Sequence, residues 1–95
     1  MSEIISHAIT ALSERLSDGF EGTAKFEITG EGTIMVDETG VREGDEDADV
    51  TMIASAETFQ GIIEGDVNPT AAFMTGKLKI EGNMGMAMKL GSALS

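Results

Sequence analysis

Residues 77–90 have the sequence KLKIEGNMGMAMKL, in which the spacing of the apolar residues changes from that of a strand to that of a helix. Over residues 77–81, charged and apolar side chains alternate, as expected of a strand with one buried face. Gly82 and Asn83 then mark a helix start, and the following methionines and leucine lie at helical spacing. A strand that leads directly into a helix favours a mixed α+β fold.

The expected final helix has apolar side chains on two sides. Met84 and Met88 share one face, whereas Met86 points about 160° away from Met84. One side can pack on the sheet, and the other needs the remaining helices, a partner chain or a bound molecule to cover it. Met84, Met86, Met88 and Leu90 are therefore candidate ligand contacts.

The same patterns assign the rest of the chain. Strands are expected at residues 23–29, 33–37, 41–44 and 50–54, and helices at residues 3–16, 56–64 and 69–75. Ser55 and Asn68 are suitable N-caps, Pro69 suits a first helical position, and the first helix is expected to end near Gly19. The prediction is one α+β domain over residues 1–95, whose single sheet shares its apolar face with four helices.

The two middle helices supply further candidate ligand contacts. Phe59, Ile62 and Ile63 lie at i, i+3 and i+4, so they share one helix face. Ala72 and Phe73 are expected to face inward on the short helix that follows. With the methionines of the last helix, these aromatic and aliphatic side chains predict an apolar and deformable interior.

The charge distribution argues against nucleic acid as a partner. The chain has 17 acids, six bases and a net charge of −11, which opposes approach to DNA, RNA or an anionic bilayer. The basic residues of the C-terminal part are Lys77, Lys79 and Lys89, and only Glu81 opposes them there. At most a transient membrane contact through these three lysines is expected.

Residues that could carry catalysis or bind a metal are sparse. There is no cysteine, His7 is the only histidine, and no G-x-S-x-G or phosphate-loop motif occurs. Residues 45–49 begin like a calcium loop, but Val50 and Ala56 stand where that loop needs Gly and Glu. We therefore expect a solvated edge loop at residues 45–49, no catalytic residue, no metal and no cofactor.

Residues 68–90, NPTAAFMTGKLKIEGNMGMAMKL, resemble the C-terminal half of domains of the sterol carrier protein-2 family. The Asn-Pro start, the Phe before Gly-Lys-Leu-Lys-Ile, and the Gly-Asn-Met-Gly-x-Ala-Met-Lys-Leu segment occur in order without gaps. Residues 48–52 and 56–59 are similar too. The resemblance implies a five-stranded, mostly antiparallel sheet with helices over one face, enclosing a hydrophobic tunnel. It also implies that the helix of Phe59, Phe73 and the last helix line that tunnel.

The resemblance implies a non-catalytic carrier of a fatty acid, fatty acyl-CoA, phospholipid or sterol-like ligand, which it binds and can transfer. The chain lacks the peroxisomal tail and the tryptophan often found in the family's first strands, which favours a stand-alone, bacterial-type and cytoplasmic carrier. An accessory protein that presents a lipophilic intermediate, such as a quinone precursor, to partner enzymes is an alternative. A structural module that dimerises through the Met86 side is another, and the ligand and oligomeric state stay open.

Overall fold

The computed structural model describes residues 3–16 and 20–94 and contains every strand and helix that the sequence predicts. The elements are α1 (Glu3–Arg15), β1 (Ala24–Thr29), β2 (Gly32–Asp37), β3 (Gly40–Glu43), β4 (Val50–Ser55), α2 (Ala56–Glu64), α3 (Pro69–Met74), β5 (Leu78–Gly82) and α4 (Met84–Leu94). Helix α1 ends at Arg15, and the end predicted near Gly19 lies outside the described residues.

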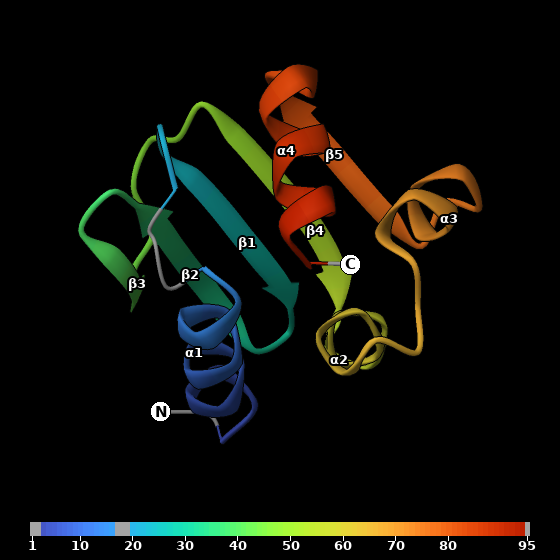
Figure 1. Ribbon diagram of the computed structural model, residues 1–95. Helices are drawn as coiled ribbons and strands as arrows, with labels where there is room; N and C mark the ends of the chain where they lie inside the picture. Colours follow the sequence, from blue (N-terminus) through green and yellow to red (C-terminus); the bar gives the residue numbers. More distant parts are fainter. Residues whose placement is uncertain (1–2, 17–19, 95) are drawn as a thin grey trace.

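The five strands form one sheet in the order β3-β2-β1-β4-β5 (Figure 1). Neighbouring strands run antiparallel except at the centre, where β1 and β4 are parallel and Ala24 lies opposite Val50. The prediction of a mostly antiparallel sheet is confirmed. The parallel pair also places β4 and β5 on one side of β1, and β2 and β3 on the other.

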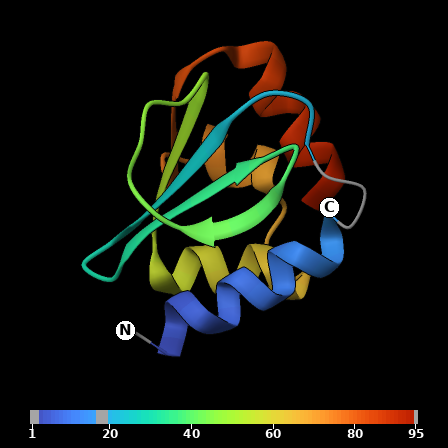
Figure 2. The same ribbon diagram turned by 90° about the vertical axis from the view of Figure 1, so that its left-hand side faces the viewer.

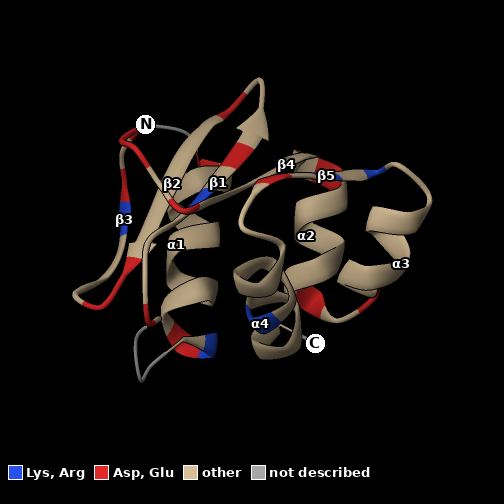
Figure 3. Cartoon of the chain, turned by 90° about the horizontal axis from the view of Figure 1, so that it is seen from above, with Lys and Arg blue, Asp and Glu red and all other residues tan. Residues whose placement is uncertain are grey.

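Alternation along the strands gives the sheet one apolar face. Phe26 lies opposite Ile34 on one side and Met52 on the other, and all three side chains are buried. Because side chains alternate between the two faces of a strand, this register puts the apolar positions of β1, β2, β4 and β5 together. The helices cover this face, with α1 and α2 side by side beneath it (Figures 2 and 3).

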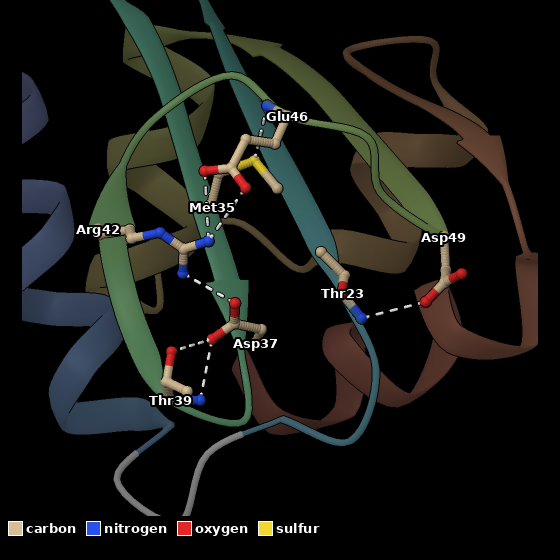
Figure 4. Close-up of polar contacts among 7 residues, drawn as sticks. All are labelled: Thr23, Met35, Asp37, Thr39, Arg42, Glu46 and Asp49. Carbon is tan, nitrogen blue, oxygen red and sulfur yellow. Dashed lines mark hydrogen bonds and ion pairs between the residues drawn. The ribbon is translucent and has the colours of Figure 1, made fainter.

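Residues 44–49 cross the outer face of the sheet to connect the edge strand β3 with β4. The charged ends of Lys25 and Asp45 are 2.9 Å apart, and the backbone N–H of Glu46 points at Sδ of Met35. Met35 lies on the outer face and is fully buried (Figure 4). The acidic segment was expected as an edge loop, but the strand order requires it to pass over β2 and β1.

The turn between β2 and β3 is fixed by Asp37. Its carboxylate accepts hydrogen bonds from the hydroxyl and backbone N–H of Thr39 and pairs with Arg42 at 2.8 Å (Figure 4). The Thr39 hydroxyl, the Arg42 guanidinium and the Thr39 N–H together lower the pKa of Asp37 to about 2. Arg42 also reaches Glu46 at 3.4 Å, so the turn is tied to the crossing segment.

Arg15 joins the ends of three helices. From the end of α1, Nη1 donates to the backbone oxygen of Leu94 at 2.8 Å and Nη2 donates to that of Ile63 at 2.7 Å. The last carbonyls of a helix have no partner within the helix and attract positive charge. The guanidinium therefore stabilises the C-terminal ends of α2 and α4 at once.

No helix in the part of the chain that the structure describes is long and apolar enough to cross a membrane. Within residues 3–16 and 20–94, the acidic and histidine side chains form no cluster of three that could hold a metal ion.

Candidate functional site

A groove lies between α3, α4 and the edge strand β5. Its cavity volume is about 360 Å³, within the range of about 300–1,000 Å³ that is usual for small-molecule sites. The lining residues are Met52, Asn68, Pro69, Thr70, Phe73, Met74, Leu78, Ile80, Met84, Ala87, Met88, Gly91 and Ser92. None of them carries a charge, so the groove suits an apolar guest.

The inner face of the sheet forms the floor of the groove. Met52 of β4 lies opposite Ile80 of β5, and Leu78 follows on the same face two residues away. Strand β5 is the edge of the sheet, so no further strand covers the groove on that side. Helices α3 and α4 supply the two walls above this floor.

The start of α4 is fixed by a close contact with the crossing segment. The N–H of Asn83 donates to the backbone oxygen of Asp49 at 2.9 Å, and Asn83 Oδ1 accepts from the N–H of Met86 at 3.1 Å. Gly82 has φ +94°, and a Cβ there would lie 2.4 Å from the Asp49 oxygen. Only glycine fits this position. The close approach of Gly82 to the crossing segment fixes where α4 begins, and therefore places Met84, its first residue, beside the groove.

Helix α3 is placed by its cap. Asn68 Oδ1 accepts from the N–H groups of Thr70 and Ala71 at 2.8 and 3.2 Å, and Pro69 takes the first helical position. A Cβ at Gly91 would lie 3.8 Å from Cβ of Pro69, so α3 and α4 meet closely at this end.

The groove is open to solvent along its rim. The residues Met74 and Met88 are 80% and 72% exposed, and Met84 is 46% exposed. Side chains with this exposure do not seal a cavity. The enclosed tunnel implied by the family resemblance therefore stays a prediction, while the cavity found at that place is a groove.

Three of the residues predicted to contact a ligand meet in the groove. Phe73, Met84 and Met88 line it from α3 and α4, which places Met84 and Met88 on one helix face as the sequence predicted. Ala72 is buried, as expected, but Phe73 is 40% exposed and faces the groove instead of the core. The inward direction predicted for Phe73 was wrong, because only one side of the short α3 touches the core.

The other five predicted residues lie outside the groove lining. Phe59, Ile62, Ile63 and Leu90 are buried in the central core, where the ring of Phe59 meets that of Phe26 edge-on at 5.2 Å. Met86 is partly buried against the core on the side of Gly22, where a Cβ would lie 2.1 Å from Met86 Cε. These side chains are wholly or partly covered in the structure, so their role in binding stays a prediction.

Four large apolar lining residues were missed by the sequence analysis. Leu78 and Ile80 were assigned only to a strand, Met52 only to the sheet, and Met74 to no site. The alternation of residues 77–81 marked Leu78 and Ile80 as the inner face of β5. What the pattern could not indicate is that β5 is an edge strand beside α4, because that depends on the strand order.

Comparison with known proteins gives a family match and a curated relative. The model of the SCP-2 sterol transfer family matches residues 3–95. Hydroxysteroid dehydrogenase-like protein 2 from Bos taurus is 39% identical over 88 residues, which cover 84% of this chain and 21% of that protein. The chain thus spans about one fifth of the length of this relative.

Two solved structures share this fold. The sterol carrier protein domain 2 of Helicoverpa armigera is 31% identical, with a TM-score of 0.70 over 95% of this chain and 81% of that one. Sterol carrier protein-2 from Aedes aegypti, solved in complex with the C16 fatty acid palmitate, has a TM-score of 0.82 at 20% identity, over 100% and 97% of the two chains. The chain belongs to the SCP-2 sterol transfer family.

Proposed function

We propose that this chain is a non-catalytic carrier that holds the hydrocarbon part of a lipid in the groove between α3, β5 and α4. The observation that carries the proposal is a lining without a charged side chain, in which methionine, leucine, isoleucine and phenylalanine predominate. Affinity then comes from apolar burial, which contributes about 0.8 kcal/mol for each CH₂ group removed from water. Family membership and the palmitate complex of the Aedes protein favour a fatty acid as the first ligand to test.

The energetics allow reversible binding without an ionic contact. Full burial of a 16-carbon chain would contribute roughly 12 kcal/mol. Association and ordering cost about 4–15 kcal/mol, which leaves affinities that permit exchange. A carrier needs this balance, because it has to release what it binds.

The test is a titration of the delipidated protein with palmitate by calorimetry. Met88→Glu places a charge in the groove at a position that is 72% exposed, so the fold should tolerate it. Ala93→Glu is the matched control, because it adds the same charge to an exposed position of α4 outside the groove lining. We expect Met88→Glu to weaken binding at least tenfold and Ala93→Glu to change it less than threefold, in line with the cost of about 1.4 kcal/mol per factor of ten. Equal affinities of the two variants would contradict the proposal.

An accessory role is the second candidate, and the exposed rim of the groove favours it. Because Met74 and Met88 lie open to solvent, a partner enzyme could reach a molecule held between α3 and α4. Such a protein would present a lipophilic intermediate, such as a quinone precursor, in place of transferring lipid between membranes. Co-purification of a biosynthetic enzyme with the tagged chain, reduced by Met88→Glu, would support this role over free transfer.

A transient membrane contact through Lys77, Lys79 and Lys89 fits the charge distribution. The three ion pairs of the described residues involve Lys25 and Arg42 as the cations, so these three lysines form none of them. Most acidic side chains lie on β1–β3 and the segments that join these strands to one another and to β4, whereas β5 carries the single acid Glu81 (Figure 3). Sedimentation with vesicles that contain phosphatidylglycerol should fall when all three lysines are changed to Gln. If the variant sediments as the parent does, the contact does not depend on them.

A further inference from the structure

The exposed large apolar side chains among the described residues all belong to the groove. They are Phe73, Met74, Met84 and Met88, so three of the four are methionines. Two other methionines are shielded, since Met35 is fully buried under the crossing segment and Met52 is only 3% exposed at the groove floor.

Exposure decides which thioethers a peroxide reaches. Oxidation turns a flexible apolar methionine side chain into a polar sulfoxide, and solvent-accessible sulfur atoms react first. The rim methionines are 46–80% exposed, whereas burial protects Met35 and Met52. Reaction should therefore begin at the residues that line the proposed lipid site.

We propose that Met74, Met84 and Met88 form an oxidation site through which peroxide weakens lipid binding. In each reaction the sulfur lone pair attacks one peroxide oxygen, the O–O bond breaks and an S–O bond forms. The sulfur loses two electrons, and after proton transfer the second peroxide oxygen leaves as water. Methionine sulfoxide reductases reverse the change, with a separate enzyme for each sulfoxide epimer.

The consequence for binding follows from the composition of the groove. A sulfoxide oxygen buried against an alkyl chain loses its hydrogen bonds to water, and the uncharged, mostly apolar lining offers few donors to replace them. Because the three side chains already face solvent, the sulfoxides should not unfold the protein. Oxidation would thus change affinity for lipid while the sheet and core remain intact.

This inference rests on the proposed function, and the experiment separates the two. The delipidated chain is treated with a small excess of hydrogen peroxide, and mass spectrometry with fragment ions assigns the sulfoxides to residues. Palmitate affinity and the melting temperature are measured before treatment, after treatment, and after incubation with both reductases. We expect sulfoxides at the three rim residues before Met35 and Met52, at least tenfold weaker binding, an unchanged melting temperature, and recovery after reduction.

A variant with all three rim methionines changed to Leu provides the matched control, because Leu keeps an apolar side chain of similar volume. The quantity compared is the ratio of dissociation constants after and before peroxide within each protein. This ratio should be at least ten for the parent chain and below two for the Leu variant. If the Leu variant binds no palmitate before treatment, the rate of methionine oxidation in the parent chain is compared with and without palmitate instead. Bound palmitate should slow oxidation of Met84 and Met88.

Three outcomes would overturn the inference. The first is oxidation of Met35 or Met52 before the rim residues, the second is unchanged affinity after full oxidation of the rim, and the third is an equal loss in the Leu variant. If the untreated parent chain does not bind palmitate at all, the proposed function fails instead.

Discussion

Replacing Arg15 with Met tests whether the contact among three helices stabilises the fold. The substitution keeps the apolar stem and removes both hydrogen bonds, at 2.8 Å to Leu94 and 2.7 Å to Ile63. Hydrogen bonds that involve a charged group contribute about 1.5–3 kcal/mol each, and the released carbonyls can regain part of this from water. We therefore expect the free energy of unfolding to fall by about 2–3 kcal/mol, which for a chain of this size lowers the melting temperature by at least ~8 °C.

Urea unfolding followed by circular dichroism measures this loss. The matched control is Arg42→Met, which removes an arginine that is itself 41% exposed and pairs with Asp37 and Glu46 at the surface. Pairs of this kind contribute about 0–1 kcal/mol, so the control should cost less than half as much. Equal losses for the two variants, or a loss below about 0.5 kcal/mol for Arg15→Met, would refute the idea that helix ends are what Arg15 stabilises.

Three further predictions concern the ligand, the acid limit and the last helix. For saturated fatty acids of 12, 14 and 16 carbons, a site that encloses the chain predicts about fourfold tighter binding per added carbon, and an open groove that buries half of the chain surface predicts about twofold. Calorimetry measures how the dissociation constant changes with chain length and so distinguishes the two. A dissociation constant that does not change with length would contradict apolar burial. Because the pKa of Asp37 is lowered to about 2, its contribution to stability is present above the ordinary value of 3.8 and is lost as the pH falls toward 2. Asp37→Asn should therefore flatten the dependence of the unfolding free energy on pH between about 4 and 2, and an unchanged slope would exclude this role. Glycines at 85 and 91 lower the intrinsic stability of α4, so this helix is expected to open locally when no ligand packs against it. Amide exchange over residues 84–94 should therefore be faster in the delipidated protein than with palmitate bound. Equal protection in the two states would argue against such opening of α4.

The secondary structure was predictable because its signals are local. Ser55 was expected to cap a helix, and its hydroxyl accepts from the N–H of Thr58 at 3.2 Å. Asn68 and Pro69 were expected to start the next helix, and α3 begins at Pro69. The alternation of residues 77–81 gave β5 with an offset of one residue, as is common at the ends of elements.

The placement of the site was less predictable because it depends on contacts between distant segments. Nothing in the spacing of residues 24–29 and 50–55 indicates that these strands pair in parallel, or that residues 44–49 therefore cross the outer face. For the same reason Met35 gave no sign that it would be buried outside the main core. Phe59 and Phe73 have similar local patterns, yet the long α2 buries the first and the short α3 leaves the second at the groove.

The parallel pairing of β1 and β4 has a consequence for how the chain folds. The two strands are joined through β2 and β3, which lie in the sheet, and through the crossing segment on its outer face, so pairing Ala24 with Val50 closes a loop over all of this chain. Contacts between residues far apart in sequence slow folding, because loop closure costs entropy before those contacts form. Changes in the turn at Gly40, where φ is +131°, should therefore lower the refolding rate more than changes in α3, whose contacts are mainly with β5 and α4, the elements that follow it in the chain.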